Sequence, residues 1–229
     1  MTTFTLISDT HGLHRKIHPP AADVLIHCGD CTTYGDLQEV ANLNEWFGTL
    51  PFEHIVLTPG NHDWAFQDDP ATARKLVTNA HLLIDESVTI DGFKIYGSPF
   101  TPRFYNWAFM LDYDYELTQK WSRIPDDTDV LVTHGPPHGK LDWSHYQKDH
   151  VGCHALRERI KEVRPMLHAF GHIHLDGGKA MEDAHTIYVN ASVCDESYRP
   201  TNEILTIALE KNDEAAEEAE KDEPGTERR

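Results

Sequence analysis

Short apolar runs recur along the chain, and most of them end at a glycine or in a cluster of polar residues. Short runs rich in Ile, Val and Leu are typical of buried β-strands. The pattern predicts strands over residues 3–8, 23–27, 54–58, 81–85, 88–91, 93–96, 129–133, 166–170, 186–190 and 204–208, with a hairpin turn at Asp91 and Gly92.

Helical spacing of apolar residues separates several of these runs. Between residues 35 and 50, Leu37, Val40, Leu43 and Phe47 fall on one side of a predicted helix. Further helices are expected over residues 70–79, 115–123 and 153–163. A helix between two strands returns the chain for a parallel strand, so the pattern favours the α/β class.

The chain of 229 residues is long enough for one large domain, which we expect over residues 1–209. Residues 210–229 hold nine acidic and four basic residues with almost no large apolar side chain, so an acidic, disordered tail is expected there. This tail carries −5 of the formal charge of −18. Since the remainder is also acidic, a long nucleic acid is not an expected partner.

The distribution of apolar residues and cysteines predicts a cytoplasmic protein. No apolar run reaches the roughly eighteen residues of a membrane span, and a strand pattern that starts at Phe4 leaves no room for a leader. Cysteines 28, 31, 153 and 194 are too few for a disulfide framework in a chain of this length. The sequence does not indicate an oligomeric state.

Five of the predicted strands end in polar residues of the same kind. Carboxyl ends of parallel strands meet at one edge of a sheet, where ligands bind, so these groups are expected to converge. The five strand ends carry Asp9 and His11, then Asp30, then Asn61, His62 and Asp63, then His134, and finally His172 and His174.

The types of these side chains favour two divalent cations. Imidazole, carboxylate and amide oxygen suit such ions, and two cations roughly 3.5–4 Å apart can hold a hydroxide for phosphoryl transfer. His172 and His174 would share one face if their segment is extended, because strand side chains alternate. The expected division places Asp9, His11 and His174 on one metal, Asn61, His134 and His172 on the other, and Asp30 between them.

Three other patterns compete with this interpretation, and each is incomplete. Cys28 and Cys31 have the spacing of a redox or zinc pair, but a structural zinc site would need a second pair. His172, His174 and Asp176 also begin a metallo-β-lactamase motif, whose final histidine would fall at Gly177. Amidohydrolases carry their His-x-His on the first strand, where this chain has Asp9 and His11.

The five strand ends, in this order, resemble the motifs of the calcineurin-like metallophosphoesterases. Three further segments are most similar to the metallophosphoesterase-domain-containing subgroup, a class III phosphodiesterase type: Gly97 to Phe109, Asn190 to Ser192 and Tyr198 to Asn202. The resemblance implies two mixed β-sheets packed as a sandwich and flanked by helices. It also implies that His62 contacts the substrate phosphate or protonates the leaving oxygen, which agrees with its position next to Asn61.

Two further residue roles are expected near this site. Asp63 is a candidate to orient His62, and both are taken as catalytic. The proline- and aromatic-rich loop after Gly97 is either a packed surface loop or a substrate wall. In the second case, Arg103 binds a phosphate and Phe104 a base, beside Asn61 and His62.

The sequence therefore predicts a metal-dependent phosphoric ester hydrolase. The favoured reaction is hydrolysis of a small nucleotide diester, cyclic nucleotides included, by a metal-bridging hydroxide with His62 assisting the leaving group. The expected cofactor is a pair of divalent ions, with Mn²⁺ ahead of Fe²⁺, Zn²⁺ and Ni²⁺. The alternatives are a phosphomonoesterase or protein phosphatase, and a slow nucleotide-binding regulatory protein that retains the metal site.

Overall fold

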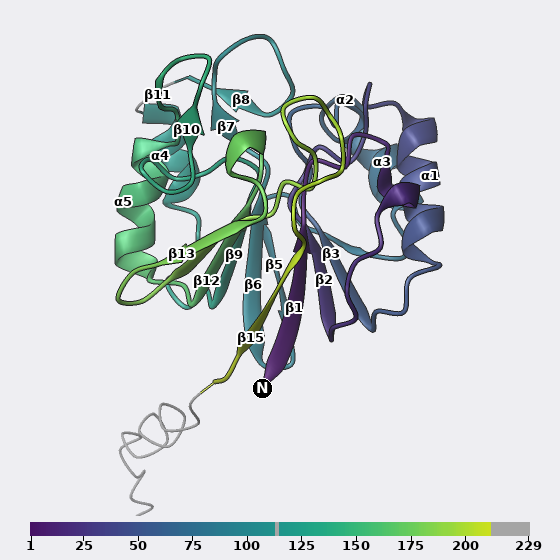
Figure 1. Cartoon of the computed structure of the whole chain (residues 1–229), viewed down its shortest axis with the longest axis horizontal. Coiled ribbons are helices and arrows are strands. Elements are labelled where there is room, and N and C mark those ends of the chain that lie inside the picture. The colour runs from purple at the N-terminus through teal and green to yellow at the C-terminus, as the bar shows by residue number, and fades with distance from the viewer. Residues whose placement is uncertain (113–114, 212–229) are drawn as a thin grey trace, which may run out of the picture.

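The computed structural model describes residues 1–112 and 115–211, and two β-sheets lie face to face at its centre (Figure 1). Both sheets are mixed and helices cover their outer faces, so the expected sandwich is confirmed. Most of the predicted acidic tail, residues 212–229, lies outside the described residues.

The first sheet has the strand order β15-β1-β2-β3-β4. Strands β1 to β4 are parallel, and β15 pairs antiparallel with β1. The strands are β1 (Thr2–Ile7), β2 (Val24–His27), β3 (His54–Leu57), β4 (His81–Leu82) and β15 (Leu205–Leu209).

The second sheet has the order β13-β14-β12-β9-β6-β5, with antiparallel pairs only at its two edges. The expected hairpin at Asp91 and Gly92 is confirmed, since it joins β5 to β6. Its strands are β5 (Glu86–Ile90), β6 (Phe93–Ser98), β9 (Val130–Thr133), β12 (Leu167–Phe170), β13 (Lys179–Glu182) and β14 (Ile187–Asn190). Two small ribbons stand apart: β7 (Thr101–Pro102) with β8 (Met110–Leu111), and β10 (Trp143–Ser144) with β11 (Asp149–His150).

Alternation along the strands divides the apolar side chains between the inside and the outside of the sandwich. Phe4 and Leu6 of β1 point between the sheets, where they pack with Ile95, Val132 and Ala169 of the second sheet. The neighbouring residues on each strand point outward toward the helices, which makes three apolar layers in all.

Helices from two stretches of the chain cover the two outer faces (Figure 1). The first sheet is covered by α1 (Leu37–Phe47), α2 (Ala65–Asp68) and α3 (Pro70–Leu76), and the second by α4 (Tyr115–Trp121) and α5 (His154–Val163). Helix α1 starts at a capping box in which Asp36 accepts a hydrogen bond from Glu39. Among the described residues, no helix has the length and apolar character needed to cross a membrane.

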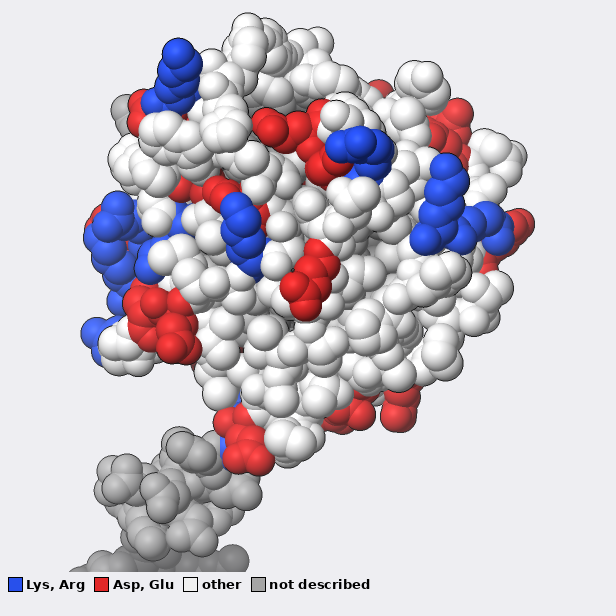
Figure 2. Space-filling view, viewed as in Figure 1, with Lys and Arg blue, Asp and Glu red and all other residues white. Residues whose placement is uncertain are grey.

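Charged side chains are mixed over the surface. On the face shown in Figure 2, Lys and Arg lie in separate small groups interspersed with Asp and Glu, and no continuous basic track crosses the centre. A long nucleic acid backbone needs such a track.

Candidate metal centre

The candidate ligands come together beyond the carboxyl ends of strands from both sheets. These strand ends lie on the upper side of the sheets in Figure 1. Asp9, Asp30 and Asn61 follow β1, β2 and β3 of the first sheet, while His134 and His172 follow β9 and β12 of the second. A parallel bridge between Ser8 and Ser192 joins the sheets at this edge. The convergence expected from the sequence is therefore present in the fold.

Among the residues that the structure describes, three groups of side chains bring ligand atoms within 4.8 Å of one another. Asp30 belongs to two of them, and its two oxygens face different neighbours: Oδ1 lies 3.3 Å from Nε2 of His134, and Oδ2 lies 4.0 Å from Nε2 of His11. The groups are Asp9, His11 and His174; His11, Asp30 and His62; and Asp30, His134 and His172.

Within the groups, several pairs of atoms lie at distances that suit a shared cation, and others, such as Nε2 of His11 and Oδ1 of Asp9 at 3.9 Å, lie somewhat farther apart. Nε2 of His174 lies 3.2 Å from Nε2 of His11 and 3.3 Å from Oδ1 of Asp9. Ligand atoms about 2.0–2.2 Å from one ion are separated from each other by roughly 3.0–3.6 Å. The residues present therefore fit a pair of divalent ions.

Backbone carbonyls orient three of the histidines. Nδ1 of His134 donates to the carbonyl of Cys28 at 3.0 Å, and Nδ1 of His174 donates to that of Asp195 at 3.1 Å. Nδ1 of His62 likewise donates to the carbonyl of Thr33, at 3.1 Å. Because a carbonyl can only accept, each Nδ1 carries the hydrogen and each Nε2 is left to face the centre, the usual arrangement of metal-binding histidines.

Asn61 lies beside the group of Asp30, His134 and His172. Its Oδ1 is 2.9 Å from Nε2 of His134, and the side chain is buried. The same imidazole nitrogen faces the carboxylate of Asp30, so two oxygens and one nitrogen meet at a single point.

The histidines of the centre differ in pKa because their surroundings differ. Burial lowers the pKa of His134, but the carboxylates of Asp30 and Asp9 more than offset this and raise it to about 9. Burial dominates at His172 and lowers its pKa to about 3. Burial also opposes ionisation of Asp9, yet its hydrogen bond to His174 and the surrounding histidines bring its pKa well below the usual value. These surroundings favour ionised carboxylates, and a bound cation would take the place of a proton on Nε2 of His134.

Strained backbone aims several of these side chains. Four of the candidate ligands have φ angles in the left-handed region, which residues other than glycine rarely adopt. These angles are 55° at Asp9, 42° at His11, 50° at Asp30 and 70° at His172. Such strain persists where the surrounding structure imposes it, and it is concentrated at functional sites. His172 is consequently not in an extended segment, and His174 begins a short 3₁₀-helix, His174–Asp176. The expected alternation of the two imidazoles is wrong, although both reach the centre.

His62 lies beside the ligands and is held from two sides. Its ring stacks on Trp107, with centroids 4.5 Å apart, and its edge meets His11 at 4.7 Å. Nε2 of His62 lies 3.9 Å from Asp30. The ring is thus placed at the boundary between the candidate ligands and the open cavity.

The expected contact between Asp63 and His62 is wrong. The carboxylate of Asp63 is buried and accepts hydrogen bonds from the backbone N–H groups of Gly60, Cys31 and Thr32, at 2.7, 3.3 and 2.9 Å. The hydrogen bonds of Asp63 therefore connect the loop after β3 to the loop after β2. The His62 ring is hydrogen-bonded to the carbonyl of Thr33 instead.

Arg103 also differs from expectation. Its Nε donates to Asp112 at 2.6 Å and its guanidinium reaches the carbonyl of Met110, so the charge is directed along its own loop. Phe104 does line the cavity at the centre, as expected, together with Tyr105 and Trp107 from the same loop.

The cysteines take no part in the centre. Cys28 and Cys31 are free and fully buried, in different apolar layers on the two faces of the first sheet. Burial raises the pKa of both thiols well above the ordinary value. The expectation that Asp30, and not the cysteine pair, is the functional residue of this loop agrees with these positions.

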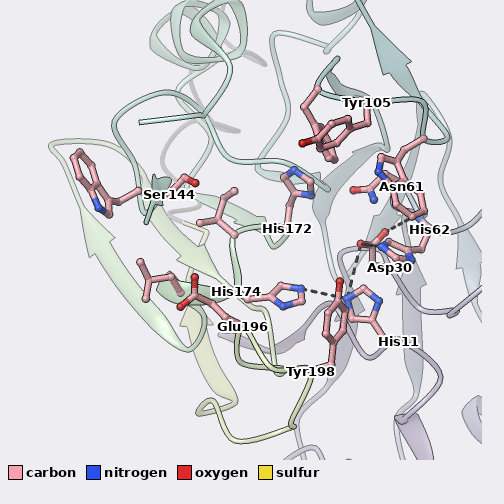
Figure 3. A pocket seen from close by; sticks show the side chains of 15 residues that line it. His11, Asp30, Asn61, His62, Tyr105, Ser144, His172, His174, Glu196 and Tyr198 are labelled. Carbon is pink, nitrogen blue, oxygen red and sulfur yellow. Dashed lines mark hydrogen bonds and ion pairs between the residues drawn. The ribbon is translucent and has the colours of Figure 1, made fainter. Parts of the chain in front are cut away.

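A cavity of about 420 Å³ opens over the candidate ligands (Figure 3). Its wall includes Glu196 and Tyr198, which were not expected from the sequence. The Tyr198 ring lies 4.8 Å from His11 and 5.3 Å from His174, on a backbone with φ of 57°. Ser192 was also missed, and its hydroxyl donates to Asp9 at 2.7 Å. These residues lie far from the strand-end motifs in sequence, and only the similarity of residues 190–192 and 198–202 to one subgroup points to their region.

Comparisons with known proteins agree with this geometry. The model of the family described as calcineurin-like phosphoesterase matches residues 2–176. Metallophosphoesterase domain-containing protein 1 of Homo sapiens is 41% identical over 232 residues, which cover 91% of this chain and 71% of that protein. A UPF0046 protein of Caenorhabditis elegans is 35% identical over 223 residues, covering 86% of this chain and 76% of its own.

A solved structure extends the similarity of fold. Phosphopantetheinyl hydrolase from Mycobacterium tuberculosis superposes with a TM-score of 0.61 at 15% identity, covering 91% of this chain and 96% of that one. At this identity the likeness concerns the fold alone.

Proposed function

The chain belongs to the calcineurin-like phosphoesterase family, and on that premise we propose that it hydrolyses a small phosphodiester at a centre of two divalent cations. The observation that carries the proposal is the position of Asp30, whose two oxygens face His134 on one side and His11 on the other. A carboxylate shared in this way is suited to bridge two ions.

The two ions would be held by two sets of residues. Bound there, a pair of cations supplies Lewis acidity and an activated water for phosphoryl transfer. Mn²⁺ is the proposed metal, because carboxylate, amide oxygen and imidazole form a ligand set without thiolate. Asp9, His11 and His174 would hold one ion and Asn61, His134 and His172 the other, with Asp30 between them.

His62 is proposed to act on the leaving group. Its Nδ1 hydrogen is committed to the carbonyl of Thr33, and its stacking on Trp107 fixes the ring plane. Nε2 therefore faces Asp30 and the cavity. When the ring is doubly protonated, Nε2 also carries a hydrogen, and it can hand this proton to a departing oxygen.

The charge of the cavity favours a diester over a monoester. A diester carries a single negative charge, whereas a monoester dianion gains from an additional cationic side chain. Among the described residues that line the cavity there is no Lys or Arg, and Arg103 is paired with Asp112. The aromatic wall of Phe104, Tyr105 and Trp107 suits a planar substituent, so a nucleotide diester is the proposed substrate class.

The cysteines support a cytoplasmic location. All four are free and buried, in keeping with a reducing compartment.

The test is an assay of the metal-supplemented protein on bis(p-nitrophenyl) phosphate and p-nitrophenyl phosphate, with Mn²⁺, Fe²⁺, Zn²⁺ and Ni²⁺ in turn. We expect faster turnover of the diester, and a loss in kcat of about 10²–10⁴-fold in His62→Ala, the range of a lost acid catalyst. His185→Ala, which removes an exposed imidazole, is the control. If none of the four metals supports turnover although the protein binds nucleotides, the protein acts as a nucleotide-binding regulator and the proposed enzymatic function is wrong.

A further inference from the structure

A second cavity, of about 540 Å³, adjoins the one over the candidate ligands. The two share the side chains of Phe104, Tyr105, Ser144, His172 and Ile173 as a common wall. His172, one of the candidate ligands, therefore borders both cavities, and Figure 3 shows it between Ser144 and Asn61. A phosphate at the metal centre would sit where the two cavities meet.

The far wall of the second cavity is the ribbon of β10 and β11. Its base is held by Asp142, a fully buried carboxylate that accepts from the backbone N–H groups of Gly139 and Gly152, both at 2.9 Å. The other oxygen of Asp142 lies 2.6 Å from Nδ1 of His150 on β11. These bonds make the ribbon a fixed wall whose turn, with Tyr146 and Gln147, stands over the cavity.

The lining combines aromatic faces with neutral hydrogen-bonding groups. Phe104, Tyr105 and Tyr146 supply the rings, while Gln147 and His154 supply donors and acceptors. Tyr146 is 89% exposed, Tyr105 66% and Phe104 39%, so three exposed rings line the same cavity. Exposed apolar groups gathered in one place are typical of a binding surface. The described residues that line this cavity include no Lys or Arg, and Asp149 is among them, so a second phosphate would meet no compensating charge.

We propose that this second cavity binds the retained arm of the diester, and that this arm is an uncharged, planar, hydrogen-bonding group of the nucleoside class. The leaving arm then lies in the first cavity beside His62. Hydrolysis forms a bond from a water oxygen to phosphorus and breaks the bond from phosphorus to the leaving arm, whose oxygen takes up a proton. The inference rests on the proposed function and narrows the substrate to acyclic diesters. In a cyclic mononucleotide both ester oxygens belong to one nucleoside, so no second group would fill the second cavity.

Two chromogenic diesters that differ only in the retained arm test this assignment. In p-nitrophenyl thymidine 5′-phosphate the retained arm is a nucleoside, and in methyl p-nitrophenyl phosphate it is a methyl group. With the Mn²⁺-loaded protein we expect kcat/KM to be at least ten-fold higher for the thymidine ester. In the double variant Tyr146→Ala, Gln147→Ala, we expect KM for the thymidine ester to rise about ten-fold with kcat unchanged, while both constants for the methyl ester stay the same.

Tyr115→Ala, which removes an exposed ring on α4 away from both cavities, is the matched control and should alter neither substrate. If the wild type hydrolyses both esters equally well and the double variant changes neither, the second cavity is not a substrate site although the proposed function stands. If the wild type hydrolyses neither ester, the proposed function fails, and the assignment of the cavity fails with it.

Discussion

Gly29 shows how closely the residues around the metal centre are packed. It follows β2 with φ of 106°, and a Cβ atom added there would lie 2.6 Å from Nδ1 of His134 and 2.7 Å from the backbone nitrogen of Gly60. That imidazole nitrogen donates to the carbonyl of Cys28, so a side chain at Gly29 would break the bond that orients His134. Two features therefore require glycine here: the close approach of the His134 ring from the opposite sheet, and the positive φ angle of the backbone.

Gly29→Ala should therefore lower both metal affinity and kcat/KM by about 10–100-fold, the effect of losing an orienting contact on a ligand. The matched control is Gly92→Ala in the β5–β6 turn, which has φ of 79° but nothing within 4 Å of the added Cβ. Both variants carry the left-handed strain of roughly 1–2 kcal/mol, so both should lose some stability. Isothermal titration with Mn²⁺ and the diester assay separate them, and equal metal affinity in the two variants would contradict this account of Gly29.

The contacts of Arg103 and Asp63 differ from those predicted, and they show what the type of a residue does not reveal. The role expected of Asp63 rests on its place next to His62, and that expected of Arg103 on the composition of its loop. The partners of both residues are decided by geometry that residue types do not encode. Arg103 pairs with Asp112 because β7 and β8 form a ribbon that brings the two together. Asp63 binds backbone N–H groups, which every non-proline residue carries and which therefore leave no mark in the sequence.

Whole elements were more predictable, because burial leaves a pattern of apolar residues. The strands that carry the candidate ligands and the helices α1 and α5 all lie within the predicted ranges, give or take a residue at their ends. The ribbon of β10 and β11 was missed because it has no buried face: Trp143, Asp149 and His150 are all exposed. An element without an apolar side gives no periodic signal, although this ribbon forms the wall of the second cavity.

Strand β12 buries an imidazole that serves the fold and not the centre. Nε2 of His168 lies 2.8 Å from the hydroxyl of Thr133, which itself donates to the carbonyl of Gly135. The ring packs against Phe170 and Tyr188 in the apolar layer beneath α5. Burial lowers the pKa of His168 to about 3, so the folded protein holds it neutral where the unfolded chain would protonate it.

The sign of the resulting pH dependence follows from that difference. The unfolded state binds more protons at this residue between pH ~6.5 and ~3, so its contribution to stability is complete above that window and is lost as the pH falls through it. Between pH 7.5 and 5.5, wild type should lose about 1.4 kcal/mol more unfolding free energy than His168→Gln. Urea titrations of the chelator-treated proteins measure this, and parallel pH profiles would show that His168 does not titrate on unfolding.

At the scale of the whole molecule, the metal centre joins the two sheets. Each proposed set of ligands draws on both: Asp9 and His11 come from the first sheet with His174 from the second, and Asp30 from the first with His134 and His172 from the second. Without ions, the described contacts between the sheets at this edge include the Ser8–Ser192 bridge and the bond from Ser192 to Asp9. Bound metal would therefore act as a cross-link of the folded state.

Metal removal should accordingly destabilise the fold as well as the activity. At a metal concentration about one hundred times Kd, each ion contributes about 2.7 kcal/mol and the two together about 5.4 kcal/mol. For a chain of this size, that corresponds to a rise in Tm of roughly 10–20 °C over the chelated protein. His172→Ala should show less than half of that rise and a loss of diester hydrolysis, because one set loses a ligand, whereas His185→Ala should keep the full rise. Scanning calorimetry with and without Mn²⁺ makes the comparison.

Two results would contradict this account. A full rise in Tm in His172→Ala would show that His172 is not a ligand. No rise in the Tm of the wild type with any of the four metals would argue against a dimetal centre that spans the sheets.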